Sequence, residues 1–226
     1  MMKGFFITGT DTGVGKTVVA AALIHHLAET GRRVAGMKPV AAGCVLTAEG
    51  WRNDDALQLL AAGNVPLGYE EVNPFALPAA IAPHLAAREA VMELSVAVLH
   101  AHYAQLAART DCVIVEGAGG WRVPLNDRES VADLAVALNL PVILVVGIRL
   151  GCLNHALLSG EAIIRSGAHW AGWVANLVDP AMEKIAENIA TLETQLAAPR
   201  LATFPHLARV DVAALAAEFK LAAVRP

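Results

Sequence analysis

Short apolar runs of strand length alternate with longer helical stretches along the 226-residue chain. We expect strands over residues 4–8, 34–39, 112–116, 142–147, 172–176 and 201–204. Between and after them, the sequence predicts helices over residues 16–30, 54–62, 89–108, 131–138, 154–166, 181–196 and 210–221. Strands this uniformly apolar are typical of a parallel sheet that is covered on both faces. The pattern therefore predicts an α/β protein with three layers, α/β/α, around a mainly parallel sheet.

Residues 41–83 form the one long irregular insertion in this series, and functional loops often have this character. No repeat, low-complexity tract or linker divides the chain, so we expect a single domain over residues 1–226. Ligands of such sheets bind beyond the carboxyl ends of the strands. The residues directly after each strand are therefore the first candidates for function.

The segment after the first apolar run predicts a strand, a phosphate-binding loop and a helix; it reads Gly9-Thr10-Asp11-Thr12-Gly13-Val14-Gly15-Lys16-Thr17. Gly13 and Gly15 let backbone amides turn toward phosphate oxygens, Lys16 adds a positive charge, and the Thr17 hydroxyl suits magnesium. The helix that begins near Lys16 aims its positive end at the same phosphates. Thr10 stands where the usual first glycine of this loop falls, so the sequence predicts a variant nucleoside triphosphate site.

Lys38 ends the second expected strand and precedes Pro39, whose ring favours an extended conformation that points beyond the sheet edge. A second cation beside a phosphate loop can neutralise the charge of a transferring phosphoryl group. The alternative is an ordinary solvated lysine. Glu116 ends a buried strand before a run of small residues, where a carboxylate can hold magnesium; the alternative is a capping or surface acid.

Two further segments carry polar groups whose function the residues leave open. Asp54 and Asp55 fall at an expected helix start, where we favour a capping role for at least one of them. The segment that begins at Gly151 follows another apolar strand, and its free helix-start amides predict a pocket for a carboxylate.

Composition narrows the class of partner. Against 21 acidic residues there are 17 lysines and arginines, a net charge of −4, so no global basic field favours nucleic acid or an anionic membrane. Small-molecule partners are expected instead. Cys44, Cys112 and Cys152 are too scattered for a disulfide framework and fit packing roles in a reducing cytoplasm. Residues 134–158 break into strand and helix, and no export signal or membrane span is expected.

Several ordered motifs together resemble the dethiobiotin synthetase family: the phosphate loop, Met37-Lys38-Pro39-Val40, Arg52-Asn53-Asp54-Asp55-Ala56, Val115-Glu116-Gly117-Ala118-Gly119-Gly120-Trp121, and the segment from Gly151 to His155. The segments that end at Asn176 and begin at Phe204 also resemble that family's nucleotide-base segments. The resemblance implies a P-loop NTPase fold and a cytoplasmic homodimer. It also implies that ATP, magnesium (Mg²⁺) and carbon dioxide (CO2) are used to close a cyclic urea on 7,8-diaminononanoate in biotin synthesis.

The resemblance also implies a role for each matching position. The nucleotide phosphates would lie on Gly13, Val14, Gly15, Lys16, Thr17 and Val18, with Thr17, Asp55 and Glu116 around magnesium. Gly117, Ala118 and Gly119 would border the nucleotide, Asn176 would recognise adenine, and Pro205, His206 and Leu207 would line the base pocket. Lys38 would take the main catalytic role beside Lys16. The substrate would contact Thr12, Lys38 and Ala42, and its carboxylate would reach Gly151, Cys152, Leu153 and Asn154 of the neighbouring subunit.

Two departures and two rival classes accompany this interpretation. Ala42 replaces a common serine or threonine, and Ala80 replaces an expected proline; the missing hydroxyl removes a hydrogen bond worth about 0.5–1.5 kcal/mol. A rival ATPase switch of the partition and division-site type carries a second lysine where this chain has Asp11. A rival amide-forming ligase, such as the cobyrinate amidating group, needs ammonia, and 226 residues leave no glutaminase domain, although free ammonia could substitute.

Overall fold

The centre of the protein is a six-stranded sheet, seen in a computed structural model that describes residues 3–221. Its strands lie in the order β10-β9-β8-β1-β7-β2, and every neighbouring pair runs parallel. They are β1 (Gly4–Gly9), β2 (Val34–Met37), β7 (Cys112–Gly120), β8 (Val142–Gly147), β9 (Trp170–Asn176) and β10 (Arg200–Phe204). All six expected strands are present, and the prediction of a mainly parallel sheet is confirmed.

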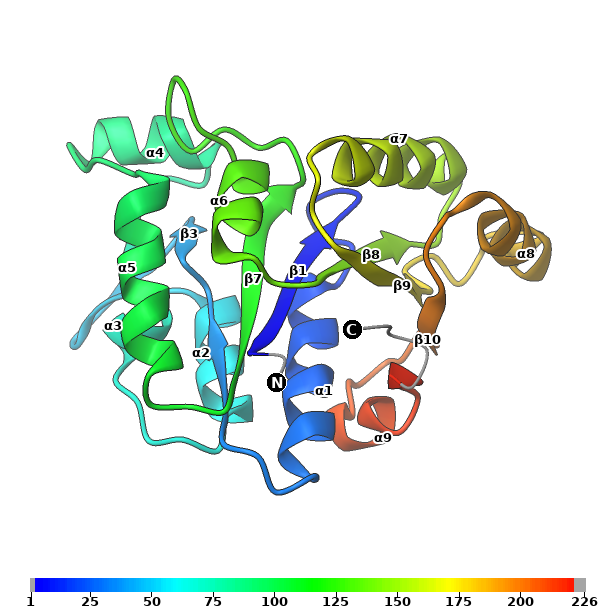
Figure 1. The fold of residues 1–226 in the computed structure, drawn as a ribbon, viewed down its shortest axis with the longest axis horizontal. Helices are drawn as coiled ribbons and strands as arrows, with labels where there is room; N and C mark the ends of the chain where they lie inside the picture. The colour runs from blue at the N-terminus through cyan, green and yellow to red at the C-terminus, as the bar shows by residue number, and fades with distance from the viewer. Residues whose placement is uncertain (1–2, 222–226) are drawn as a thin grey trace.

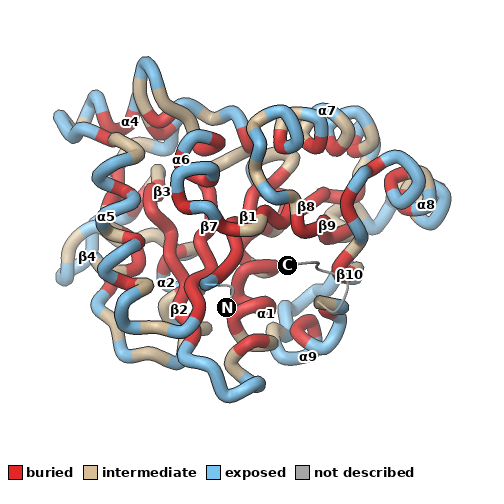
Figure 2. The backbone as a smooth tube through the Cα atoms, viewed as in Figure 1, coloured by how far each residue is buried: buried red, intermediate tan, exposed pale blue. Residues whose placement is uncertain are grey.

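Helices cover both faces of this sheet, so the three-layer prediction is also confirmed (Figure 1). One layer holds α1 (Lys16–Ala28), α2 (Asp54–Ala62), α3 (Tyr69–Val72) and α9 (Val212–Ala216). The other holds α4 (Pro83–Glu89), α5 (Val96–Ala107), α6 (Val131–Leu138), α7 (Cys152–Arg165) and α8 (Ile185–Gln195). Successive strand residues serve opposite layers: Phe5 and Ile7 pack toward α1, and Phe6 packs toward α6. The buried strands at the centre of Figure 2 reflect this double cover.

The expected irregular insertion over residues 41–83 is more ordered than predicted. Within it, β3 (Val40–Ala42) pairs in parallel with β6 (Phe75–Leu77), and β4 (Val45–Thr47) pairs with β5 (Gly50–Arg52) as a hairpin. Each of these strands has only three residues, so their hydrophobic pattern is too short to separate from a loop. The insertion forms a folded wall beside the carboxyl end of β2.

Some helix boundaries were predicted wrongly. The helix expected over 89–108 forms only as α5, from Val96 onward, because α4 already ends at Glu89 and Ser95 caps α5 by accepting a hydrogen bond from Val98 N at 3.3 Å. The last helix ends at Ala216 and not at residue 221. Lys184 has a left-handed backbone with a φ of 57°, so α8 begins at Ile185, later than expected. Left-handed Gly151 starts α7 two residues earlier than expected.

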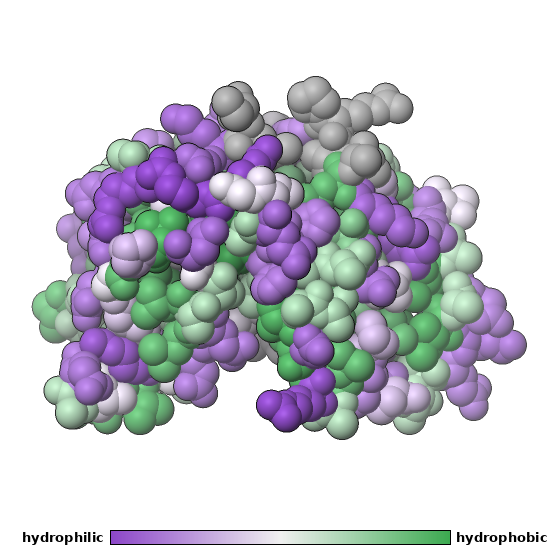
Figure 3. Space-filling model, turned by 90° about the horizontal axis from the view of Figure 1, so that it is seen from below, coloured by the Kyte–Doolittle hydropathy of each residue, from purple (hydrophilic) through white to green (hydrophobic). Residues whose placement is uncertain are grey.

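The surface is mixed in character, and the thiols lie where the sequence predicted them. Hydrophilic and hydrophobic residues are interspersed on the face seen from below in Figure 3. Between residues 3 and 221, no helix combines the length and the apolar character that a membrane crossing requires. Cys44, Cys112 and Cys152 are all buried and unpaired, as their predicted packing roles require, and burial raises the pKa of Cys112 to about 11.

Candidate functional site

A cleft of about 770 Å³ lies at the carboxyl edge of the sheet, beside the centre of the strand order. Parallel sheets bind their ligands in this position. The cleft gathers many of the residues that the sequence singled out: Thr12, Gly13, Gly15, Lys16, Thr17, Val18, Lys38, Ala42, Asp55, Glu116, Ala118 and Gly119. These residues come from four separate parts of the chain, which only the fold brings together.

The phosphate loop joins β1 to α1 with two left-handed glycines. Gly13 has a φ of 73°, and Gly15 has a φ of 89° and is the residue just before α1. L-residues with a Cβ rarely adopt such angles, so these glycines shape the turn that begins the helix. Lys16 turns back over the loop, and its Nζ donates a hydrogen bond to the Asp11 carbonyl at 2.9 Å. The loop thus presents a lysine and a helix N-terminus to the cleft.

Lys38 lies at the centre of a charged cluster. Its Nζ is 2.6 Å from Glu116 Oε1 and 2.9 Å from Asp55 Oδ2. The same Glu116 oxygen accepts a hydrogen bond from Thr17 Oγ1 at 3.0 Å. Lys38 and Glu116 are almost fully buried, at 6% and 1% side-chain exposure, whereas Asp55 is partly open to the cleft. The cluster therefore ties the first helical turn of α1 to β2, β7 and α2.

Asp55 owes its position to the start of α2. Asn53 caps this helix, because its Oδ1 accepts hydrogen bonds from the backbone nitrogens of Asp55 and Ala56. The prediction that Asp54 or Asp55 caps the helix is therefore wrong: both occupy its first turn. Asn caps a helix as well as Asp does, and Asn53 occupies the position just before the first helical residue. Asp55 is thereby free to face Lys38.

Burial and neighbouring charges shift the proton affinities of the cluster. Burial lowers the pKa of Lys16 from 10.5 to about 8; the Glu116 carboxylate opposes this, and the Lys38 charge adds to it. Burial also acts to lower the pKa of Lys38, but the Glu116 and Asp55 carboxylates outweigh it and hold that pKa above 10.5. Burial would raise the pKa of Asp55, yet Lys38 keeps it below its usual value. Lys38 and Asp55 are thus both charged at neutral pH.

The oxygen atoms of this cluster suit a hard divalent cation. Glu116 Oε2 is buried without a hydrogen-bond partner among the described residues, while Oε1 of the same carboxylate accepts from the Thr17 hydroxyl, and Thr17 and Asp55 line the same cleft. No group of three His, Cys, Asp or Glu residues is close enough for an all-protein metal cage within residues 3–221. Magnesium rarely uses such a cage, since it keeps several waters and binds one or two carboxylates together with substrate phosphates. The residues present fit magnesium brought by a nucleotide.

Other predicted site residues lie outside the cleft lining. Asn176, at the end of β9, donates from Nδ2 to the Val14 carbonyl at 2.8 Å and so contacts the back of the phosphate loop. Gly117 packs against Phe6 and Val131 in the core. Two expected sets do not line this cleft: Pro205, His206 and Leu207, which are exposed after β10, and Gly151, Cys152, Leu153 and Asn154, which form the start of α7.

The structure adds residues that sequence reasoning missed. Gln58 lies one turn after Asp55 on α2 and lines the cleft. Ala80, Ile81, Ala82 and Pro83 form another part of the wall. The i to i+3 spacing from Asp55 to Gln58 was a usable signal. The resemblance had named Ala80 as a departure, but no pattern placed residues 80–83 in the cleft, since their position follows from the pairing of β3 with β6.

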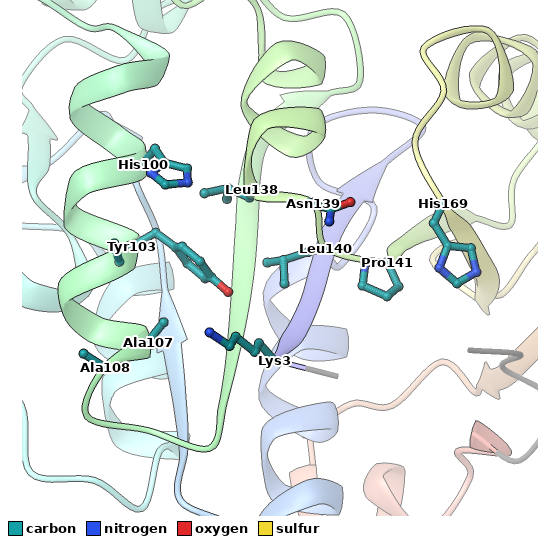
Figure 4. A pocket seen from close by; sticks show the side chains of 11 residues that line it. Lys3, His100, Tyr103, Ala107, Ala108, Leu138, Asn139, Leu140, Pro141 and His169 are labelled. Atoms are coloured by element: carbon teal, nitrogen blue, oxygen red, sulfur yellow. The ribbon is translucent and has the colours of Figure 1, made fainter. Parts of the chain in front are cut away.

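A second cavity of about 740 Å³ lies at the opposite, amino edge of the sheet (Figure 4). It is bordered by Lys3, by His100 and Tyr103 of α5, by Pro141 and by His169. Lys3, Pro141 and His169 directly precede β1, β8 and β9. This cavity is therefore separate from the phosphate loop and from the edge where parallel sheets carry their ligand sites.

Known proteins of similar sequence cover nearly all of the chain. A family model described as an AAA domain matches residues 3–214. The ATP-dependent dethiobiotin synthetase BioD of Pseudomonas paraeruginosa (strain DSM 24068 / PA7) is 57% identical over 221 residues, 97% of this chain and 97% of the relative. The protein of the same name from Xylella fastidiosa (strain 9a5c) is 50% identical over 206 residues, 91% of each.

Solved structures share the fold at much lower identity. The septum site-determining protein MinD complexed with Mg-ADP from Pyrococcus horikoshii OT3 is similar with a TM-score of 0.58 and 19% identity. The similarity covers 91% of this chain and 82% of that chain. At this identity the likeness concerns the fold, which is that of P-loop NTPases.

Proposed function

The chain belongs to the ATP-dependent dethiobiotin synthetase family, and from this premise we propose how its cleft closes the ring of dethiobiotin. The family is one of ATP-dependent ligases in biotin biosynthesis. The substrates in our proposal are 7,8-diaminononanoate, carbon dioxide and ATP, and the products are dethiobiotin, ADP and phosphate. We take residues 1–226 as one domain that carries the whole cleft, in the cytoplasm, where the free cysteines would stay reduced.

The proposed reaction moves negative charge at each step. An amine of the substrate adds to carbon dioxide and gives a carbamate. A carbamate oxygen then attacks the γ-phosphorus of ATP, ADP leaves, and a carbamic-phosphoric anhydride remains. The second amine attacks the carbamate carbon, phosphate leaves, and the cyclic urea closes. No covalent enzyme nucleophile is needed, so the protein acts by placing and stabilising charge.

The two cleft lysines take different parts in this scheme. Lys16 and the loop amides bind the β- and γ-phosphates, as lysines of such loops do. Lys38 directly follows β2 and is held by Glu116 and Asp55, and its Nζ stabilises the carbamate and the phosphoryl group in transfer. Thr12 and Ala42, which line the same cleft, border the substrate. Gly117 borders the nucleotide, Asn176 recognises its adenine, and the segment from Pro205 to Leu207 lines the pocket of the base.

Magnesium belongs to this proposal through Thr17, Asp55 and Glu116, whose oxygens would hold it. When bound, it neutralises phosphate charge and favours transfer of the γ-phosphoryl group. Lys38 now satisfies one oxygen of each carboxylate, while Glu116 Oε2 has no partner among the described residues. That buried oxygen is the observation that supports a cation here, because an unpartnered carboxylate oxygen in the interior is costly.

We further propose a homodimer in which each cleft is completed by the partner. The segment from Gly151 to Asn154 does not line its own cleft, yet its helix-start amides suit a carboxylate. Beside it, Leu150 is 92% exposed. Light scattering would give the mass in solution. Mixing Lys38→Ala chains with chains altered at Asn154 tests sharing: random pairing of the two would rebuild about a quarter of the sites.

The observation that carries the reaction is the convergence of Lys38 and Thr17 on one oxygen of Glu116. It places the Lys38 charge, directly after β2, beside Thr17 in the first turn of α1. The direct test incubates the protein with magnesium, ATP, bicarbonate and 7,8-diaminononanoate and measures dethiobiotin by mass spectrometry, with each component omitted in turn. Product that requires every component supports the proposal; product that forms without ATP, or no product from the complete mixture, refutes it.

A further inference from the structure

Two side chains, one after β8 and one at the end of β9, form hydrogen bonds with the phosphate loop. Arg149 follows β8, and its Nη2 lies 2.6 Å from Asp11 Oδ2. Asn176 ends β9 and donates to the Val14 carbonyl at 2.8 Å. These strand ends are joined to each other, because Ile148 N donates to the Asn176 carbonyl at 2.7 Å. The loop is therefore bonded at two points to one connected framework.

Asp11 connects this framework to the phosphate site. Its Oδ1 accepts a hydrogen bond from the backbone nitrogen of Thr12 at 2.7 Å, and its carbonyl accepts one from Lys16 Nζ at 2.9 Å. Its other carboxylate oxygen meets Arg149. Any displacement of Asp11 therefore moves Thr12 and the acceptor of Lys16 together.

Arg149 also bonds in the other direction along the chain. Its carbonyl accepts a hydrogen bond from Cys152 N, the first residue of α7, at 3.0 Å. Gly151, between them, has a left-handed φ of 92°, and no atom would lie within 4 Å of a Cβ added to it. One residue thus contacts the phosphate loop through its side chain and the start of α7 through its main chain.

The small contribution that the Asp11–Arg149 pair can make to stability argues against a purely structural role. The two side chains are 48% and 42% exposed, and ion pairs this open contribute about 0–1 kcal/mol to stability. The hydrogen bond between the two side chains is nevertheless short, at 2.6 Å, and it joins Arg149 to Asp11 of the phosphate loop. Because Arg149 contacts both the phosphate loop and the start of α7, a shift of one segment can move the other.

We propose that Arg149 is a positioning residue that couples nucleotide binding at the phosphate loop to carboxylate binding at the start of α7. Nucleotide that fixes Lys16 and Thr12 fixes Asp11, which orders Arg149 and, through its carbonyl, the first amides of α7. This inference rests on the proposed function, which puts the substrate carboxylate at those amides. In the proposed dimer, the coupling joins the nucleotide of one subunit to the substrate in the cleft of the other.

The test compares substrate affinity with and without a non-hydrolysable ATP analogue by calorimetry. The ratio of the two dissociation constants for 7,8-diaminononanoate is the coupling factor, expected at about five or more in the unaltered protein. Arg149→Ala and Asp11→Asn should each bring it toward one, and the double variant should go no further, since both remove one interaction. Arg149→Lys should keep most of the coupling. In Arg149→Ala, kcat should change less than the KM for 7,8-diaminononanoate.

Arg33→Ala is the matched control, because Arg33 forms a 2.9 Å pair with Asp111 at similar exposure and far from the cleft. It should leave the coupling factor unchanged. Thermal melting of every variant checks that it folds. A factor of one in the unaltered protein, an unchanged factor in Arg149→Ala, or additive effects in the double variant overturns the inference. Dethiobiotin formation by the unaltered protein separates such a failure from a failure of the proposed function.

Discussion

Lys38 Nζ lies 2.6 Å from Glu116 Oε1, although the two residues are 78 positions apart in the chain. Their neighbours Met37 and Val115 are paired in the register of β2 and β7, so both side chains leave the sheet at the same edge. The pair is buried, and each charge is tolerated because the other is present. A nucleotide and magnesium would compete for the same two groups, so ligand binding should act directly on a contact that also stabilises the fold.

Lys38→Ala should leave nucleotide binding nearly intact and slow ring closure in a single turnover by about 100-fold or more. In the proposed mechanism Lys38 acts on the substrate; the structure shows its Nζ bonded to Asp55, whereas Lys16 Nζ bonds the Asp11 carbonyl of the phosphate loop. Lys16→Ala should therefore lose ATP affinity and turnover together. Rapid quench with excess enzyme measures the chemical step, and intact single-turnover ring closure in Lys38→Ala would remove the central role of this lysine.

The same substitution should also change stability. Removal of one partner of a buried ion pair typically costs about 3–5 kcal/mol, because the other charge stays buried. Lys38→Ala should thus lower the free energy of unfolding by a few kcal/mol. Arg33→Ala, which breaks an exposed pair, should cost about 1 kcal/mol or less. Urea unfolding without ligand compares the two, and equal losses would contradict the importance of burial.

Affinity for ATP should fall as the pH rises through about 8. Lys16 has a pKa of about 8 in the ligand-free protein, so it is charged below this pH and neutral above it. Phosphate prefers the charged form, and the dissociation constant should rise by up to about tenfold per pH unit above 8. Calorimetry between pH 7.5 and 9.5 measures the slope. Lys16→Arg should flatten it, since a guanidinium keeps its charge.

Stability of the ligand-free protein should respond to pH in the opposite direction. The folded pKa of Lys16 lies below the ordinary value of 10.5, so the unfolded chain binds more protons between about pH 8 and 10.5. Loss of the proton therefore favours the folded state as the pH rises through this window. Lys16→Met should remove this contribution, and an unchanged pH dependence in that variant would contradict the lowered pKa.

Sequence patterns predicted the parts of this protein that depend on local spacing. The loop from Gly9 to Thr17 has a fixed length and sits between a strand and a helix, so its position in the fold was readable. Lys38 and Glu116 were found because each ends an apolar run. Their mutual contact was not derivable from pattern alone, since it needs the pairing of β2 with β7.

The errors have equally specific causes. Asn53 and Asp54 are adjacent residues of similar capping strength, so pattern alone does not decide which of them starts α2. The strands β3 and β6 have three residues each and pair across more than thirty positions, which leaves no local signal. The hydrogen bond from Asn176 to the Val14 carbonyl joins residues 162 positions apart, and no local pattern at either residue predicts it.

Ala42→Ser should strengthen substrate binding. Ala42 lines the cleft near Lys38 and offers no hydrogen bond. A hydroxyl at this position would add one bond of about 0.5–1.5 kcal/mol, which lowers the KM for 7,8-diaminononanoate by about two- to tenfold. Steady-state kinetics measure the change, with Ala80→Ser on another part of the wall as the control. A KM that stays the same or rises would show that residue 42 does not face the bound substrate.

Gly15→Ala should disable the phosphate loop for two separable reasons. Gly15 has a φ of 89°, where an alanine costs about 1–2 kcal/mol, and an added Cβ would overlap the Asn176 amide. Gly31→Ala isolates the first reason, because Gly31 has a φ of 81° and no neighbour within 4 Å of an added Cβ. We expect the control to lose stability only, and Gly15→Ala to lose at least tenfold in affinity for inorganic tripolyphosphate as well.

Asn176→Ala in the Gly15→Ala background then tests the clash itself. This second change removes the amide group that the new Cβ would meet. Tripolyphosphate carries no base, so its affinity reports the loop and is independent of the proposed adenine contact of Asn176. The double variant should regain part of the lost affinity while keeping the cost of the left-handed alanine. Asn176→Ala alone is the control, because it also loses the 2.8 Å hydrogen bond to the Val14 carbonyl. If this control keeps its affinity and the double variant binds no better than Gly15→Ala, the loop fails for backbone strain alone, and the packing of Asn176 against Gly15 has no part in shaping the phosphate site.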